Sequence, residues 1–225
     1  MRIHIVGAAG AGKTTLARRL AAHLHCPHVE LDALYWQPNW ARTPAAHFQA
    51  AVLRALHSPA WVADGSYESV REQIWAQADH VLWLDYGAHV LAWRSFWRGV
   101  GNIVHHTDLW GTGNHESWGW LLSRESIVVR SLAARQRMRA DYATCWAHPR
   151  YGRRHFVYLP TPEATRRWLA AFLRSTSLPP GHLDARPASE VRSRVAHREH
   201  ASICARRRRR GAALTCHAAR QLSAH

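Results

Sequence analysis

One segment near the N-terminus constrains the fold of this chain more strongly than any other. Residues 7–14 read Gly-Ala-Ala-Gly-Ala-Gly-Lys-Thr and match G-x-x-x-x-G-K-[ST], the motif of phosphate-binding loops, or P-loops. A β-branched run over residues 2–6 precedes the motif, and residues 14–24 follow it with apolar side chains at helical spacing. A loop between a strand and a helix places backbone N–H groups and the helix N-terminus around one phosphate. The sequence therefore predicts an α/β fold with a phosphate site at the end of its first strand.

The P-loop contains the only lysine of the chain, since 29 of the 30 Lys and Arg residues are arginines. The Lys13 ammonium is compact and flexible enough to reach β- and γ-phosphates inside a tight loop. The Thr14 hydroxyl is a predicted Mg²⁺ ligand. Without a second lysine the guanine-reading motif N-K-x-D cannot exist, so we expect ATP as the nucleotide. The predicted nucleotide-binding residues are Gly7, Ala8, Ala9, Gly10, Ala11, Gly12, Lys13, Thr14 and Thr15.

Hydrophobic strand-like segments alternate with segments of helical periodicity as far as residue 175. This alternation predicts a parallel sheet covered by helices on both faces. We expect strands at 2–6, 28–32, 60–65, 80–85 and 155–159, and helices at 14–24, 43–57, 68–77, 88–100, 117–146 and 162–174. The helix at 117–146 is expected either as one long helix or as a broken one. Ligands of such sheets bind beyond the carboxyl ends of the strands. Gly7, Asp32, Asp64 and Asp85 fall at those ends.

The acids at the strand ends are candidates for metal and substrate chemistry. Asp85 follows the hydrophobic run 81–84, the pattern of a Walker B acid, and is a predicted Mg²⁺ ligand beside Thr14; the alternative is a cap or turn residue. Asp32 is expected to order Mg²⁺ waters or to hold an acceptor hydroxyl, with a helix cap as the alternative. Residues 64–67, Asp-Gly-Ser-Tyr, are either a substrate contact or an ordinary turn.

Arginines are the second chemical resource, because phosphoryl transfer needs positive charge around the transferred group. Arg94 and Arg98 lie four residues apart on one predicted helix, so they share a face. They precede residues 101–116, which are rich in Gly, His and Asn and are predicted to form the loop of a lid at about 98–126. The candidate catalytic residues are therefore Lys13, Asp32, Asp85, Arg94, Arg98 and Arg124. A solvated helix face is expected for Arg130, Arg135, Arg137 and Arg139.

Two further residue groups invite a functional interpretation. Most of the 12 tryptophans are expected in the core or half-buried, but Trp36 and Trp40 follow Asp32 in a loop and are candidates for stacking on a base or ring. A metal site is not expected from the His and Cys residues at 23–28, because they span a helix end and a strand start and should diverge.

The net charge of +15 is concentrated toward the C-terminus. Residues 176–225 hold ten arginines and three acids, and Arg206–Arg210 are consecutive. We expect this segment to be a solvated, disordered tail, with contact to nucleic acid or another anionic surface as the alternative. No apolar run approaches the roughly 18 residues of a membrane helix, no signal-peptide pattern opens the chain, and the four cysteines are scattered. These features predict a cytoplasmic protein with one domain at 1–175.

Several segments together resemble bacterial P-loop proteins related to adenylate kinase, some of which are labelled topology modulation proteins. The resemblance covers about residues 1–173 and rests on residues 7–15, 31–40, 61–67, 78–85, 113–117 and 123–127. It implies a three-layer P-loop NTPase fold like that of nucleoside monophosphate kinases, with a five-stranded parallel sheet of order 2-3-1-4-5 and a lid. It also implies that the loop and Lys13 hold ATP, that Thr14 and Asp85 serve Mg²⁺, and that lid arginines clamp phosphates.

The function expected from these features is that of an ATP-dependent phosphotransferase, a P-loop kinase acting on a small molecule, nucleoside or nucleotide with ATP and Mg²⁺. The alternative is a nucleotide-binding regulatory ATPase associated with DNA, which the basic tail motivates. The sequence does not identify the phosphate acceptor.

Overall fold

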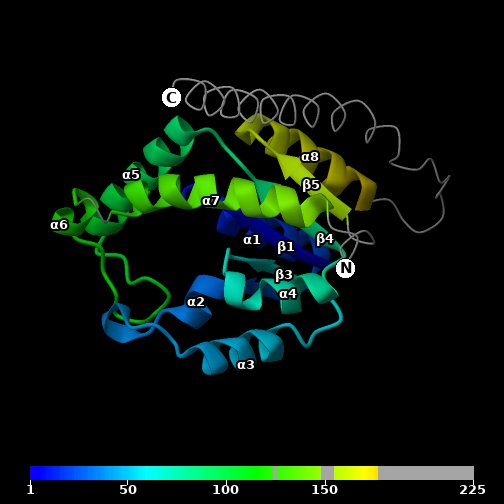
Figure 1. Cartoon of the computed structure of the whole chain (residues 1–225), viewed down its shortest axis with the longest axis horizontal. Coiled ribbons are helices and arrows are strands. Elements are labelled where there is room, and N and C mark those ends of the chain that lie inside the picture. Colours follow the sequence, from blue (N-terminus) through cyan, green and yellow to red (C-terminus); the bar gives the residue numbers. More distant parts are fainter. Residues whose placement is uncertain (124–125, 148–154, 177–225) are drawn as a thin grey trace, which may run out of the picture. The chain divides into compact units, whose positions relative to one another are not determined.

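The computed structural model describes residues 1–123, 126–147 and 155–176 (Figure 1). All of them belong to one unit, Met1–Thr176. The predicted tail lies, after Thr176, outside the described residues, and so does Arg124.

A five-stranded parallel sheet forms the centre of this unit. Its strands are β1 (Arg2–Gly7), β2 (His28–Glu30), β3 (Trp61–Asp64), β4 (His80–Leu84) and β5 (His155–Leu159). They follow the order β2-β3-β1-β4-β5, and every pairing is parallel. The α/β class and the predicted strand order are therefore confirmed. In this order β1 lies in the middle, so the P-loop leaves the sheet at its centre.

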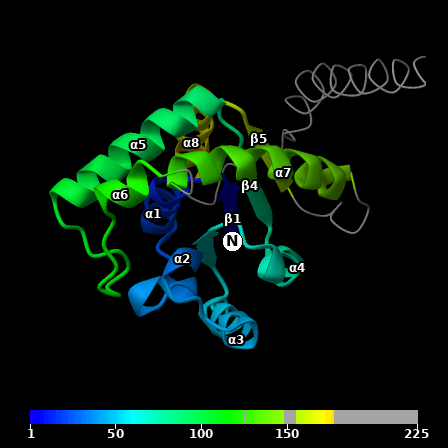
Figure 2. The same cartoon turned by 60° about the vertical axis from the view of Figure 1, so that its left-hand side comes forward.

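The helices are α1 (Lys13–Leu24), α2 (Leu31–Tyr35), the 3₁₀ turn η1 (Pro38–Trp40), α3 (Ala45–Ala55), α4 (Glu68–Gln77), α5 (Ala88–Val104), α6 (Trp118–Leu121), α7 (Ile127–Ala147) and α8 (Pro162–Thr176). Apolar side chains of α3, α4 and α7 form one core with one face of the sheet. Those of α1, α5 and α8 form a second core with the other face. Figure 2 shows α3 and α4 on one side of the strands and α5 and α8 on the other.

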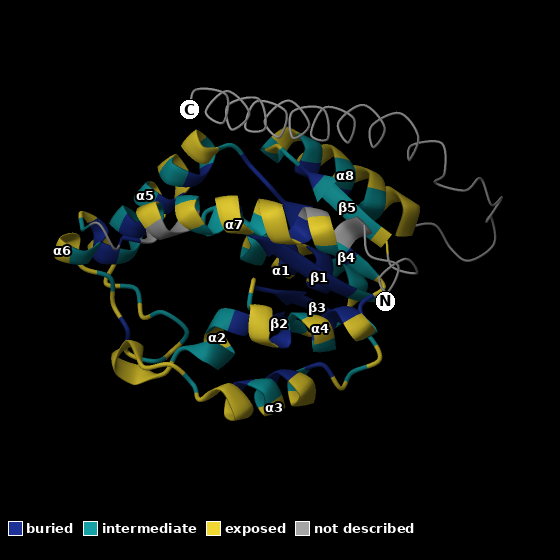
Figure 3. Ribbon diagram, in the orientation of Figure 1, coloured by how far each residue is buried: buried dark blue, intermediate teal, exposed yellow. Residues whose placement is uncertain are grey.

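Both faces of the central strand are buried, which explains its continuous hydrophobic run. Ile3 and Ile5 belong to the core of α1, α5 and α8, whereas Val6 belongs to the opposite core. β1 and β3 appear among the buried segments of the molecule in Figure 3. Burial on two faces removes most of the apolar surface of the central strands from water, the dominant favourable contribution to folding.

The structure differs from the prediction at the second strand and decides an open alternative at 117–146. The second strand ends at Glu30, and Asp32 lies in the first turn of α2 rather than at a strand end. Of the two alternatives for residues 117–146, the structure has the broken helix, as α6 and α7. None of the helices among the described residues combines the length and the apolar character needed to cross a membrane.

Candidate functional site

A large cavity opens at the carboxyl end of β1 and encloses about 1970 Å³. The P-loop and the start of α1 line one part of it, and the rest includes residues of α2, η1, the segment after β3, α5, the loop between α5 and α6, α7 and α8. All nine predicted nucleotide-binding residues, from Gly7 to Thr15, line this cavity. A pocket for one small molecule usually has about 300–1,000 Å³, so this cavity has room for two ligands side by side.

The glycines of the P-loop satisfy steric requirements that other residues would not. Gly10 and Gly12 have φ angles of 79° and 87°, in the left-handed region that favours glycine. A Cβ atom on Gly10 would lie 2.8 Å from the carbonyl oxygen of Leu91, which shows how closely α5 approaches the loop. The sequence pattern and the backbone geometry therefore agree at the phosphate-binding segment.

Lys13 is the first residue of α1 and lies against its own loop. Its Nζ donates a hydrogen bond of 3.2 Å to the Ala8 carbonyl. Burial lowers the pKa of Lys13, while the nearby carboxylates of Asp32 and Asp64 oppose that shift. The Lys13 ammonium is therefore attracted by two carboxylates, that of Asp64 at the end of β3 and that of Asp32, which follows β2.

The Thr14 hydroxyl donates a hydrogen bond of 2.7 Å to Oδ2 of Asp64. The other oxygen, Oδ1, lies 2.6 Å from Nε2 of His28. The Asp64 carboxylate is 2% exposed, so both of its oxygens are engaged by protein groups rather than by bulk water. A hydroxyl that donates its only hydrogen to an acid presents its oxygen lone pairs elsewhere, as a cation ligand must.

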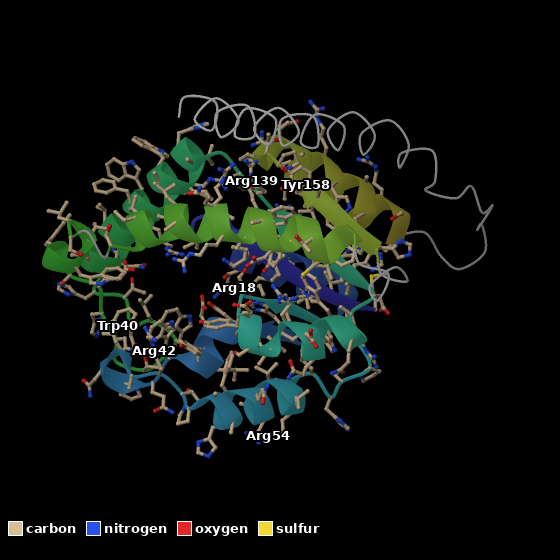
Figure 4. The ribbon with its side chains drawn as sticks, in the orientation of Figure 1. Arg18, Trp40, Arg42, Arg54, Arg139 and Tyr158 are labelled. Carbon is tan, nitrogen blue, oxygen red and sulfur yellow. The ribbon has the colours of Figure 1, made fainter. Side chains whose placement is uncertain are left out.

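Asp85, the predicted Mg²⁺ acid, has other partners. Its Oδ2 accepts hydrogen bonds from Arg139 Nε at 2.6 Å and from the Tyr158 hydroxyl at 2.8 Å. Arg135 Nε lies 3.2 Å from Oδ1. Figure 4 shows the labelled Arg139 and Tyr158 beside one another. Burial, followed by the Asp85 charge, raises the pKa of Tyr158 to about 12.

This arrangement bears on two predictions. Neither Asp85 nor Asp64 is among the residues that line the cavity, but the Asp85 carboxylate is compensated by two guanidinium groups. The acid that contacts Thr14 is Asp64, so the geometry favours Asp64 over Asp85 as the acid of a magnesium site. The expectation of a solvated face for Arg135 and Arg139 is corrected, because both contact a buried carboxylate.

The segment after β3 contacts both the P-loop and α2. Ser66 Oγ accepts a hydrogen bond of 3.0 Å from the Gly7 N–H and donates one of 3.1 Å to the Gly7 carbonyl. The Tyr67 hydroxyl donates a 2.5 Å hydrogen bond to Oδ1 of Asp32. Burial and the adjacent Asp32 charge raise the pKa of Tyr67, so the phenol remains protonated. Asp32 therefore lines the cavity with one oxygen fixed by Tyr67.

Two of the predicted lid arginines reach the P-loop. Arg94 and Arg98 project from α5 and line the cavity. The Arg94 guanidinium lies over the Tyr86 ring, 5.5 Å from its centroid, and the charge of Arg98 is close enough to lower the pKa of Lys13. Arg124 lies outside the described residues, so its predicted phosphate contact stays a prediction.

The loop between α5 and α6, residues 105–117, packs against the segment after α2. The Asn114 side chain is 2% exposed and bonds this segment twice, accepting from the Trp40 N–H at 2.9 Å and donating to the Gln37 carbonyl at 2.9 Å. The Trp110 indole donates a 3.0 Å hydrogen bond to Glu30. Figures 1 and 2 both show this loop beside the turn that follows α2.

Indole rings from both segments meet at this contact. Trp40 lies edge-on to Trp36 and Trp110, with ring centroids 5.7 Å and 6.2 Å apart, and stacks on Trp120 at 6.1 Å. All four rings line the cavity. The backbone of Trp40 and Trp110 is left-handed, with φ of 57° and 61°, a conformation that bulky residues adopt only where their surroundings impose it.

Sequence analysis missed several residues of this site. His28 had been grouped with neighbouring His and Cys residues and left without a role, yet it contacts Asp64 across two strands. Asn114 lies in the segment 113–117 of the predicted lid, where sequence analysis assigned it no individual role. No local pattern identifies either residue, because each contact joins segments more than 30 residues apart.

Comparisons with known proteins find solved structures of similar fold, but no similar sequence. No protein-family model matches the sequence. No curated protein matches it either. A shikimate kinase from Acinetobacter baumannii in complex with shikimate has 20% identity and a TM-score of 0.46; the match covers 79% of this chain and 95% of that chain. A shikimate kinase from Bacteroides thetaiotaomicron has 15% identity and a TM-score of 0.44, with 79% and 99% covered. The resemblance to the adenylate-kinase-related group therefore stays a prediction, and the fold assignment rests on the strand order and the P-loop.

Proposed function

We propose that this chain is an ATP-dependent phosphotransferase that transfers a phosphoryl group to a hydroxyl of a small acceptor. The observation that carries the proposal is the shared cavity. A complete P-loop, the carboxylate of Asp32 and the guanidinium groups of Arg94 and Arg98 all open onto it. Phosphoryl transfer asks a protein mainly for positioning and for compensation of charge, and these residues supply both.

The P-loop would hold the nucleotide phosphates. Its left-handed glycines let the backbone N–H groups approach the phosphates closely, and the N-terminus of α1 adds partial positive charge. Lys13, Arg94 and Arg98 would surround the transferred group with positive charge. Lys13 would leave its bond to the Ala8 carbonyl when phosphate oxygens become available.

The residues around Thr14 fit a magnesium ion that is bound largely through the nucleotide. Thr14 donates its hydrogen to Asp64, so its oxygen is free to ligate a cation. Mg²⁺ would supply positive charge at the β- and γ-phosphate oxygens. Among the described residues no cluster of three or more His, Cys, Asp and Glu side chains is arranged to hold an ion on its own. A site completed by phosphate oxygens is consistent with that finding.

Asp32 would orient the acceptor. One of its oxygens is fixed by the Tyr67 hydroxyl, which leaves the other to accept a hydrogen bond from the attacking hydroxyl. The far wall of the cavity is aromatic, built from Trp36, Trp40, Trp110 and Trp120. The acceptor would therefore lie between Asp32 and these indoles, on the opposite side of the transferred phosphate from the P-loop.

ATP binding and turnover by wild-type protein and the Lys13→Ala variant test the proposal. We expect ADP formation to rise when the right hydroxyl compound is supplied from a panel of sugars, nucleosides and small hydroxy acids, with the phosphate recovered on that compound. Lys13→Ala should lose at least 100-fold in turnover, the cost of removing one preorganised charge donor. Arg54→Ala is the matched control, because Arg54 is an exposed cation of α3 that does not line the cavity (Figure 4).

Two results would decide against this function. Full turnover by Lys13→Ala would remove the P-loop from the chemistry. ATP binding without acceptor-dependent turnover would instead favour the alternative, a nucleotide-binding regulatory ATPase.

A further inference from the structure

His28 connects the edge strand of the sheet to the P-loop through Asp64. In the pairing of β2 with β3, Glu30 lies opposite Asp64, and His28 lies two residues earlier on the same face of β2. A side chain in that position reaches the diagonal neighbour on the adjacent strand. The His28 imidazole does so, with Nε2 at 2.6 Å from Oδ1 of Asp64. The contact is sheltered, since the His28 side chain is 17% exposed and that of Asp64 2%.

The three side chains form a continuous chain of hydrogen bonds. Asp64 accepts at both oxygens, from His28 on one side and from the Thr14 hydroxyl on the other. A carboxylate held at one oxygen only can rotate about its last torsion, whereas one held at both is fixed in its plane. The direction of the Thr14 O–H bond, and with it the direction of the oxygen lone pairs, then depends on the His28 contact.

We infer that His28 is a positioning residue for the magnesium ion of the proposed reaction, acting through Asp64 on Thr14. This inference rests on the proposed function, because it assigns a role within the nucleotide site. His28 does not line the cavity and so touches neither nucleotide nor acceptor. Residues that hold a metal-site group from behind typically change metal affinity by about 10- to 100-fold when they are removed.

A merely structural role for His28 would have a different consequence. If the bond only joined β2 to β3, its loss would lower the stability of the fold and leave the magnesium dependence of nucleotide binding unchanged. The distinguishing quantity is therefore the ratio of nucleotide affinities measured with and without magnesium, which a uniform loss of stability does not alter.

The experiment measures binding of the non-hydrolysable ATP analogue AMP-PNP to the full chain by calorimetry, once with Mg²⁺ and once with EDTA. His28→Leu removes the donor but keeps bulk, and His28→Gln keeps an N–H donor close to the position of Nε2. His57→Ala is the matched control, because His57 is an exposed histidine away from the cavity. Urea unfolding of each variant records stability separately. If His28→Leu does not fold, His28→Ala takes its place.

We expect magnesium to tighten AMP-PNP binding by wild-type protein, by His57→Ala and by His28→Gln. In His28→Leu the tightening should shrink about tenfold or more, while the affinity in EDTA stays unchanged. An unchanged ratio in His28→Leu, or an equal loss in His28→Gln and His28→Leu, would overturn the inference while the proposed function stands. Absence of any nucleotide binding by wild-type protein would overturn the proposed function, and the inference with it.

Discussion

Asp64 and Asp85 lie at the ends of the two strands that flank β1, but only Asp64 contacts Thr14. Both acids are buried, and they differ in their partners. Asp64 is hydrogen-bonded to a hydroxyl and an imidazole, whereas Asp85 forms ion pairs with two guanidinium groups and accepts a hydrogen bond from a phenol. The two carboxylates are therefore expected to give opposite results when each is replaced by its amide.

Asp64→Asn should impair phosphoryl transfer without unfolding the protein. The amide keeps the shape of the carboxylate but loses its charge, and its NH₂ group cannot accept the bonds that both carboxylate oxygens accept now. We expect ATP turnover to fall about 10- to 100-fold at equal protein concentration. Steady-state kinetics over a range of Mg²⁺ concentrations measure the effect. If Asp85→Asn lost magnesium-dependent turnover and Asp64→Asn did not, Asp85 would be the metal acid after all.

Asp85→Asn should act on stability. Its side chain is 1% exposed and compensates Arg135, which is 20% exposed, and Arg139, which is 48% exposed. Removing one partner of a buried ion pair leaves an uncompensated charge, and the exposure of Arg139 moderates the cost, so we expect a loss of about 3 kcal/mol.

Urea unfolding followed by far-UV circular dichroism checks this value. Glu163→Gln is the matched control, because Glu163 also pairs with two arginines, Arg166 and Arg167, but on the exposed surface of α8. That variant should unfold at nearly the wild-type urea concentration. Equal effects of the two substitutions would show that burial of Asp85 is not what makes its ion pairs matter.

Asn114→Ala should release the 105–117 loop from the segment after α2. The substitution removes two hydrogen bonds and leaves the Gln37 carbonyl and the Trp40 N–H without their side-chain partner. We expect faster amide exchange in residues 36–42 and 105–117 by hydrogen–deuterium exchange and mass spectrometry. Gln77→Ala is the control, because the Gln77 amide bonds only within its own helix. Unchanged exchange in both segments would mean that the indole contacts alone hold the loop.

The sheet could be predicted from the sequence because its signals are local. The three central strands are short hydrophobic runs, largely buried, and the P-loop fixes the first strand–loop–helix unit. The order of the strands came from the resemblance, not from those runs. The structure confirms the α/β class and the predicted order.

The choice between Asp64 and Asp85 could not be made from the sequence. Both acids end a hydrophobic strand next to β1, so the local pattern is the same. What separates them is the path of α1, which packs on β3 as the chain crosses toward β2 and so carries Thr14 to the β3 side. That path follows from the right-handed crossover and the strand order together, which are properties of the fold.

His4, in the central strand β1, is buried. Its Nδ1 accepts a hydrogen bond of 2.9 Å from the Trp75 indole, and Nε2 lies 3.0 Å from the Gly65 carbonyl, so the neutral Nε2–H form satisfies both partners. Burial lowers the pKa of His4 to about 4, below the value of about 6.5 expected in the unfolded chain.

This difference predicts how stability depends on pH. Between pH 6.5 and 4 the unfolded state takes up a proton at His4 that the native state does not, so stability falls as the pH falls, by about 3 kcal/mol in total, and levels off below pH 4. Urea unfolding of wild-type protein and His4→Gln at several pH values isolates this contribution, since subtraction of the two curves cancels the other histidines. We expect the difference between the two free energies to be constant above pH 7 and to shrink toward pH 4. A difference that stayed constant over the whole range would show that His4 is protonated as readily in the native state as in the unfolded chain, and that burial does not hold it neutral.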